Sequence, residues 1–146
     1  MERRRFLAAG LAAAGVAAAG CLGRSNAAGS DHDVGMSHQR FLPATYEVAP
    51  GTTVVWKNTG SRPHTVTAYD SGTPDGVAFF ASGGYDTEQA ARQAWRTGSG
   101  GGLDGGETYE HTFEVPGEYQ YFCIPHEPGG MVGTIVVAET ATRTPR

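Results

Sequence analysis

A strictly alternating segment in the second half of the chain constrains the fold most. Over residues 108–115, one set of alternate positions holds apolar or aromatic side chains and His111, and the other set holds Thr and Glu. A period of two places these sets on opposite faces of a β-strand whose apolar face meets a core. Pro116-Gly117 then turns the chain into an aromatic run that ends at Cys123. The segment therefore predicts two successive strands.

Strand signals recur between turn residues along the rest of the chain. β-Branched and aromatic residues fill 52–56, 64–69 and 134–137, and alternating apolar residues precede the turn pair Pro50-Gly51. The 22 glycines and eight prolines, with few helix-forming runs, also favour a turn-rich domain. Six or seven strands with turns this frequent predict an all-β fold, an antiparallel Greek-key β-sandwich.

One segment has helical character. Residues 86–96 begin with the candidate cap Asp86 and place Ala91, Ala94 and Trp95 at spacings of three and four. A glycine-rich stretch follows at 98–102. We expect one short helix there.

The N-terminal residues have the character of an export signal. Three arginines at 3–5 precede 15 weakly apolar residues, which are too few to cross a bilayer. We therefore predict a signal peptide over residues 1–20. The arginines resemble a twin-arginine pattern, and the small residues before Cys21 resemble a lipoprotein cleavage box. The alternative is an ordinary secretory signal with an incidental cysteine.

The segment after the signal has no periodic apolar pattern. We predict that Cys21 is lipidated and that residues 21–38 form a flexible linker, with the folded domain over 39–140 and a disordered tail over 141–146. His32, Met36 and His38 are then solvated linker residues. The alternative is that their side chains hand a metal to a deeper site.

Length and charge limit the classes of function. A chain of 146 residues has room for one ordinary domain. From Cys21 onward, 8 Lys+Arg face 14 Asp+Glu, a net charge of −6, and the positive charges are scattered. Without a basic patch, no nucleic-acid partner is expected.

Residues 121–131 contain the candidate metal ligands. Cys123, His126 and Met131 provide a thiolate, an imidazole and a thioether on one loop between two predicted strands. These donors suit a soft, redox-active copper ion. Zinc more usually takes further Cys or His, and magnesium or calcium takes oxygens.

A trigonal copper site needs a second histidine from elsewhere in the fold. The candidates are His32, His38, His64 and His111. His64 is the best placed, because it opens a predicted strand after a turn and Pro63, whereas His111 reads better as a core or edge residue. Each residue also has an alternative in which it binds no metal: Met131 as a core residue, Cys123 as a small buried hydrophobic residue and His64 as a turn residue.

At these residues the sequence resembles the cupredoxins, of the plastocyanin and pseudoazurin type, with a character like the halocyanins of salt-loving archaea. The family pattern of Cys, two residues, His, four residues, Met is matched, whereas the azurin and amicyanin loops have other spacings. Segments 41–43, 48–58 and 63–66 resemble the family's strand, turn and first-ligand motif. Between Tyr69 and Gly106 nothing matches; a lid, a partner-docking surface and a tolerated surface insertion are the alternatives, and the last is favoured.

The resemblance implies one type 1 copper ion held by His64, Cys123 and His126, with Met131 weakly on the axis. Thr65 would link the two ligand loops. The implied protein is a monomeric blue copper electron carrier and not an enzyme. It would be lipid-anchored on the extracytoplasmic side of the cell membrane and exchange electrons with a cytochrome complex, oxidase or reductase. A copper storage or delivery protein and a metal-free adhesion domain are the alternatives, whereas a copper enzyme would need a second copper site and more histidines.

Overall fold

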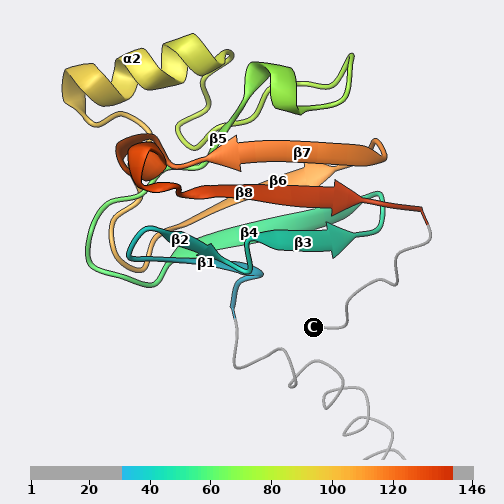
Figure 1. The fold of residues 1–146 in the computed structure, drawn as a ribbon, viewed down its shortest axis with the longest axis horizontal. Coiled ribbons are helices and arrows are strands. Elements are labelled where there is room, and N and C mark those ends of the chain that lie inside the picture. The colour runs from blue at the N-terminus through green and yellow to red at the C-terminus, as the bar shows by residue number, and fades with distance from the viewer. Residues whose placement is uncertain (1–30, 140–146) are drawn as a thin grey trace, which may run out of the picture. The chain divides into compact units, whose positions relative to one another are not determined.

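Two four-stranded sheets lie face to face in the computed structural model, which describes residues 31–139 (Figure 1). The first sheet has the order β2 (Arg40–Leu42), β1 (Val34–Ser37), β4 (Thr52–Asn58) and β6 (Thr108–Phe113). The second has the order β3 (Thr45–Val48), β8 (Val132–Val137), β7 (Gly117–Phe122) and β5 (Thr67–Ala68). The predicted all-β sandwich is confirmed.

Strand pairing is mixed rather than wholly antiparallel. β1 runs parallel to β4, and β3 runs parallel to β8, whereas the pairs β1–β2, β4–β6, β5–β7 and β7–β8 are antiparallel. A parallel neighbour requires a connection that leaves and returns. Along the chain, β3 follows β2 and precedes β4, but it belongs to the second sheet. The chain therefore crosses to the second sheet and returns, and β4 runs beside β1 in the same direction. The antiparallel part of the prediction is corrected accordingly.

The segment predicted as the end of a flexible linker contains a core strand. Val34 and Met36 in β1 have no exposed surface, because their side chains belong to the hydrophobic core that both sheets share. The carboxylate of Asp33 accepts the Val55 N–H (2.9 Å) and the Tyr46 hydroxyl (3.2 Å), which ties the entry of β1 to the sheet. The linker prediction is therefore wrong for residues 34–37, and Met36 is not solvated. With only two apolar residues, Val34 and Met36, the alternation is too short to indicate a strand by itself. Residues 21–30 of the predicted linker lie outside the described part.

Aromatic side chains fill the space between the sheets. The ring of Trp56 is fully buried and lies 5.4 Å from the Tyr121 ring and 6.2 Å from the Phe80 and Phe113 rings, centroid to centroid. The alternation over residues 108–113 is confirmed, since β6 turns Tyr109, His111 and Phe113 inward and exposes its Thr and Glu residues. Val115 lies beyond β6 and is 45% exposed.

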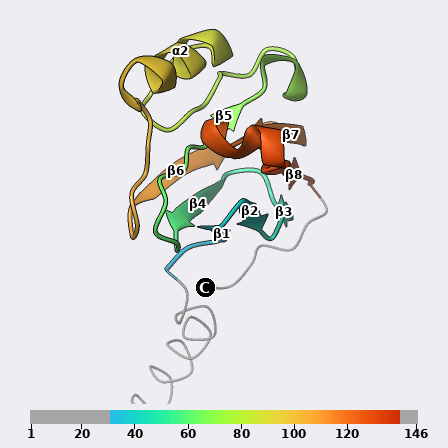
Figure 2. The ribbon, with the colours of Figure 1, turned by 60° about the vertical axis from the view of Figure 1, so that its left-hand side comes forward.

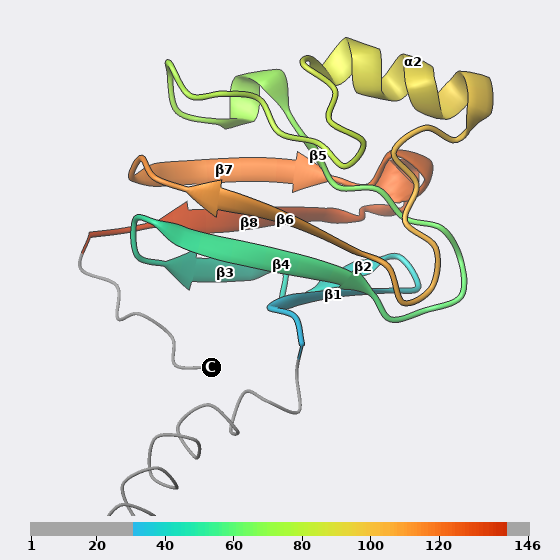
Figure 3. The same cartoon turned by 180° about the vertical axis from the view of Figure 1, so that it is seen from behind.

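The segment between β5 and β6 carries the predicted helix. α2 (Glu88–Gly98) and the 3₁₀ helix η1 (Asp70–Gly72) lie over the side of the sandwich formed by β5 and β7 (Figures 1 and 3). The N-cap is Thr87, whose Oγ1 accepts the Ala90 N–H at 3.0 Å, and not Asp86 as the sequence suggested. Serine, threonine and aspartate all cap helices well, so residue type alone does not decide between neighbours.

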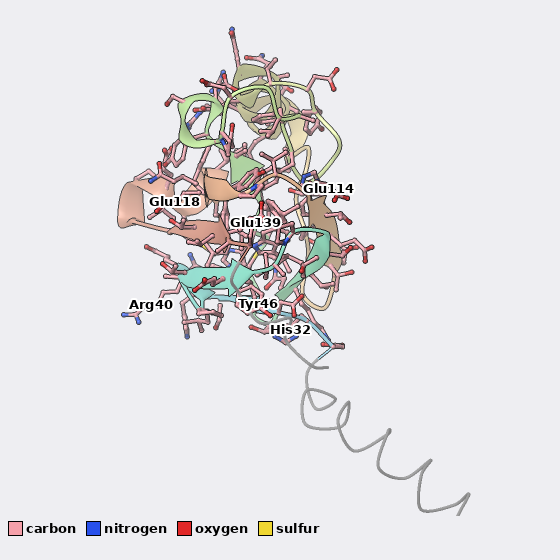
Figure 4. All side chains as sticks on the ribbon, turned by 90° about the vertical axis from the view of Figure 1, so that its right-hand side faces the viewer. His32, Arg40, Tyr46, Glu114, Glu118 and Glu139 are labelled. Atoms are coloured by element: carbon pink, nitrogen blue, oxygen red, sulfur yellow. The ribbon has the colours of Figure 1, made fainter. Side chains whose placement is uncertain are left out.

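The two ends of the sandwich differ in composition. One end gathers the connections β4–β5 and β7–β8 and the returning part of the β5–β6 connection at Leu103. The β7–β8 connection contains the 3₁₀ helix η2 (Ile124–Gly129), which faces the viewer in Figure 2. The other end, seen in Figure 4, carries Glu114, Glu118 and Glu139 near the ends of β6, β7 and β8. The predicted metal ligands all belong to the first end.

Candidate metal centre

Two connections bring the predicted ligands to one place. His64 lies between β4 and β5, where its backbone pairs with Leu103 through two hydrogen bonds of 3.1 and 2.7 Å. Cys123 follows β7 directly, and His126 lies in η2. At the ends of strands the backbone leaves the ladder, so side chains from segments far apart in sequence can converge there.

The thiol sulfur of Cys123 is the centre of the cluster. It lies 3.6 Å from Nδ1 of His64 and 3.4 Å from Nδ1 of His126, and the two imidazole rings are 4.8 Å apart. All three potential ligand atoms lie within 4.8 Å of one another. Within residues 31–139 this is the one group of three or more His, Cys, Asp or Glu side chains that can hold a metal ion, and it includes neither His32, His38 nor His111.

The three side chains are buried, and burial determines the protonation state of each. His64 and Cys123 have no exposed surface, and His126 is 9% exposed. Burial, and secondarily the charge of His126, lowers the pKa of His64 to about 4. Burial, followed by the positive charge of Arg62, also lowers the pKa of His126. Both imidazoles are therefore neutral near pH 7, and each offers a nitrogen lone pair.

The thiol behaves differently from the imidazoles. Burial raises the pKa of Cys123, although the Thr65 N–H, which donates to the sulfur at 3.4 Å, acts in the opposite direction. The metal-free thiol therefore keeps its proton, which a bound metal must displace. One thiolate and two neutral imidazoles form a donor set that fits copper.

Comparisons with known proteins agree with this donor set. The family model for copper binding proteins of the plastocyanin/azurin family matches residues 28–138. The chain belongs to this cupredoxin family. The matched region begins before residue 39, in agreement with the finding that β1 is part of the domain.

Individual relatives show how much of the chain is shared. The cupredoxin is 34% identical over 97 residues to chloroplastic plastocyanin of Tetradesmus obliquus, covering 66% of this chain and 57% of the relative. It is 32% identical over 99 residues to plastocyanin of Vicia faba, covering 66% of this chain and 86% of the relative. The chain spans about half the length of the first curated relatives it matches.

A solved structure shows the same fold inside a larger protein. A copper-containing nitrite reductase from Thermus scotoductus superposes with a TM-score of 0.53 at 27% identity, over 74% of this chain and 22% of that one. The cupredoxin fold therefore occurs as one part of an enzyme in that protein.

Met131 lies beside the cluster in this cupredoxin. Its side chain is fully buried, its N–H donates to the His126 carbonyl at 3.2 Å, and its carbonyl accepts the Cys123 N–H at 3.1 Å. These two bonds close the segment 123–131 into a tight loop that continues the β7–β8 ladder. The position is compatible with the predicted axial role.

Thr65 is hydrogen-bonded to the segment that bears Cys123 through both its side chain and its backbone. Its Oγ1 accepts the Ile124 N–H at 2.8 Å, and its own N–H donates to the Cys123 sulfur at 3.4 Å. The side chain is 1% exposed, so these bonds form away from water. Thr65 therefore fixes the spacing between the His64 segment and the Cys123 loop.

Asn58 is a supporting residue that was not among the predicted site residues. Its buried amide donates to the carbonyls of Arg62 and Leu103, at 2.7 Å each, and its Oδ1 accepts the Gly60 N–H at 2.9 Å. Asn58 thereby holds the connection that presents His64. An asparagine at the end of a buried strand, just before a turn, was the signal available.

Proposed function

We propose that this cupredoxin is a type 1 blue copper protein that transfers single electrons, with His64, Cys123 and His126 as ligands and Met131 as a weak axial ligand. The observation that carries the proposal is the preformed cluster, in which both Nδ1 atoms already lie within 3.6 Å of the Cys123 sulfur. Copper supplies a reversible one-electron couple when bound. A donor set held in place by the fold changes little between oxidation states, which favours fast transfer.

The exposure of the ligands suggests where a redox partner approaches. His126 is 9% exposed, whereas His64 and Cys123 are fully covered. Pro128 and Gly129, which follow His126 in η2, are exposed. We place the docking face for a redox protein at this end, where a partner comes within reach of the His126 ring edge. The partner is a cytochrome complex, an oxidase or a reductase, and the carrier itself acts as a monomer.

The cellular location rests on the N-terminal sequence. The signal-like residues 1–20 and the lipobox-like residues before Cys21 support export and attachment to the outer face of the cell membrane through a lipid on Cys21. These residues lie outside the described part of the structure. None of the helices between residues 31 and 139 has the length and apolar character needed to cross a bilayer. Membrane fractionation of cells expressing Cys21→Ser tests the anchor. Without the lipid, we expect the variant to leave the membrane fraction.

Optical and paramagnetic spectra of the copper-loaded chain test the site. We expect an intense thiolate-to-copper charge-transfer band and a narrow copper hyperfine splitting, because a thiolate ligand delocalises the unpaired electron. A colourless sample with bound copper would contradict the proposal. The electron self-exchange rate then separates a carrier from a copper storage or delivery protein, since only the carrier needs fast exchange.

The nitrite reductase with the same fold makes a copper enzyme the second candidate. We propose that this chain by itself is a carrier, because the part of it that the structure describes contains one metal-ligand group. Assays for nitrite reduction and oxygen reduction by the copper-loaded chain check this. Steady turnover of either substrate would contradict the carrier assignment.

A further inference from the structure

The insertion between Tyr69 and Gly106 contacts the segment that bears His64. The returning chain pairs with this segment where Leu103 exchanges two backbone hydrogen bonds with His64, of 3.1 and 2.7 Å. Ser82 repeats the arrangement one step further, because its N–H donates to the Val66 carbonyl at 2.7 Å and its Oγ accepts the Val66 N–H at 3.0 Å. Leu103 and Ser82 of the insertion therefore hold the backbone of the segment that bears His64 by hydrogen bonds.

These contacts depend on a close approach within the insertion. The Ser82 hydroxyl donates to the Gly101 carbonyl at 2.7 Å, which joins the outgoing and returning parts of the insertion. Gly101 has a φ of +83°, and a Cβ there would lie 2.6 Å from the Ser82 carbonyl oxygen. Glycine is required at this point, so at least part of the glycine-rich stretch is a packing feature.

The same insertion contacts the second ligand segment through α2. The Arg92 guanidinium donates to both carboxylate oxygens of Glu127, at 2.7 and 3.2 Å, and Glu127 is the residue after His126. The Tyr69 hydroxyl donates to Oε2 of the same carboxylate at 2.6 Å. A bidentate arginine with a third donor restricts both the position and the orientation of the carboxylate.

Two further contacts hold Arg92 itself. Its Nε donates to Glu88 one turn earlier on α2 at 2.9 Å, so the guanidinium is fixed from its own helix. Its Cζ atom lies 4.2 Å from the centroid of the Phe122 ring, and the Tyr69 ring stacks on the same residue at 4.3 Å. Phe122 is the residue before Cys123. Arg92 thus contacts the chain on both sides of the 123–126 ligand pair.

We propose that the insertion over residues 69–106 is a bracket that holds both ligand-bearing segments, and that Arg92 is the positioning residue by which it fixes the ligand loop 124–130. The bracket sets the placement of His126 relative to Cys123 before a metal binds. This inference deepens the proposed function and rests on it for the identity of the ligands. It replaces the earlier preference for a merely tolerated surface insertion.

An isolated ion pair on the surface would not fix the ligand loop, since such pairs contribute little to stability. The Arg92–Glu127 pair differs because the side chains are only 27% and 28% exposed and because Tyr69, Glu88 and Phe122 restrain the same two groups. A restrained network has less conformational freedom to lose than two free side chains. Local rigidity of the loop, rather than global stability, is therefore the property to measure.

Amide hydrogen exchange in the full-length, metal-free chain tests the bracket directly. The N–H groups of His126, Gly130 and Met131 close the ligand loop by bonding to the carbonyls of Cys123, Glu127 and His126. In Arg92→Met these three amides are expected to exchange about tenfold faster, because a charge-assisted contact that limits local opening is lost. The Trp56 amide in β4 serves as the reference for global unfolding, and its exchange rate is expected to stay the same.

The chain offers a matched control on the same helix. Arg96 is exposed, and its guanidinium donates to the Gln93 side chain of α2 at 3.0 Å. Arg96→Met therefore removes a positive charge from the same helix and leaves the contact between Arg92 and Glu127 in place. We expect loop exchange in Arg96→Met to equal that of the unaltered chain, and in Arg92→Lys to be intermediate. Unchanged loop amides in Arg92→Met, equal effects of the two Met variants, or equal acceleration at Trp56 would each overturn the positioning role.

Copper release to a chelator provides a second readout. Arg92→Met is expected to keep the visible band and to release copper about tenfold faster than Arg96→Met, as when a residue that orients a ligand is removed. Equal release rates in the two variants would overturn the proposed positioning. If the unaltered chain instead gave no blue copper spectrum, the proposed function would fail, while the exchange rates of the metal-free chain would still decide whether the bracket exists.

Discussion

His64 is fully buried and His111 is partly buried, and the chain gives the two side chains opposite surroundings. His111 lies inside β6, opposite Val54, where its ring stacks on Phe80 at 4.7 Å and 18° and meets the Phe113 ring edge-on at 4.9 Å. His64 lies outside the regular ladders, and its Nδ1 faces the Cys123 sulfur and the neighbouring His126. Burial lowers the pKa of both imidazoles.

The difference shows what turns a buried histidine into a ligand. Within β6, the ladder sets Val54 opposite His111, and the rings of Phe80 and Phe113 that contact the imidazole carry no metal-donor atom. At the end of a strand, connections from different parts of the chain meet, and their polar side chains share one small volume. Four predictions, taken from the largest expected effect to the smallest, test this contrast.

The largest effect is expected from the sulfur at the centre of the cluster. Cys123→Ser removes the thiolate, so the copper-loaded chain should lose its intense visible band completely, as measured by absorption and paramagnetic resonance. A hydroxyl of similar size keeps the packing nearly unchanged, which ascribes the loss to the donor atom. Retention of the band would show that the colour arises elsewhere and that the contrast between the two histidines has no chemical basis.

Replacing each histidine in turn tests the contrast itself. His64→Ala is expected to lower copper affinity by more than about 100-fold, beyond the loss typical of a residue that only supports a ligand. His111→Phe should leave copper affinity unchanged, because the ring contributes to aromatic packing and not to the metal group. Competition with a chelator of known affinity measures both. A loss of binding in His111→Phe comparable to that in His64→Ala would contradict the assignment.

The stability of the metal-free chain should depend on pH through these histidines. Folding lowers the pKa of His64 to about 4, so between pH 7 and 5 the unfolded state binds a proton that the folded state does not. Stability is therefore greatest above the unfolded-state pKa and falls as pH decreases, by about 2 kcal/mol for one such group over this interval. Urea unfolding at a series of pH values measures the slope.

The two histidines should contribute unequally to this slope. The His64→Gln variant should flatten it more than His111→Phe, because the larger lowering of the pKa belongs to His64. Equal flattening by the two variants would mean that burial alone, and not the clustered position of His64, decides the proton balance.

The smallest effect on binding is expected at Met131, which has both a core and a ligand interpretation. Met131→Gln should keep copper bound and lower the reduction potential, because an oxygen donor on the axis stabilises Cu(II) relative to Cu(I). Voltammetry of the variant and the unaltered chain measures the shift. Complete loss of copper would make Met131 a strong ligand, and an unchanged potential would leave it a core residue.

Much of the site could be predicted because it is local in sequence. The spacing of Cys123, His126 and Met131 lies within one loop, and the alternation over residues 108–113 specifies one face of β6. His64 required a resemblance as well, since nothing local links it to a cysteine 59 residues away. The strand β1 was missed because its two apolar residues, Val34 and Met36, have mainly polar sequence neighbours and join the core only when the two sheets pack together.

The sequence by itself determined the donor atoms, the strand-rich fold and the presence of a helix in the insertion, because these depend on residue type and short-range period. Only the tertiary structure decided which strands pair in parallel, that residues 34–37 complete the first sheet, and that Arg92 reaches Glu127 across 35 positions. Such pairings depend on which surfaces meet once the sheets have closed over Trp56. No local pattern records that information, since the contact exists only when both segments are already in place.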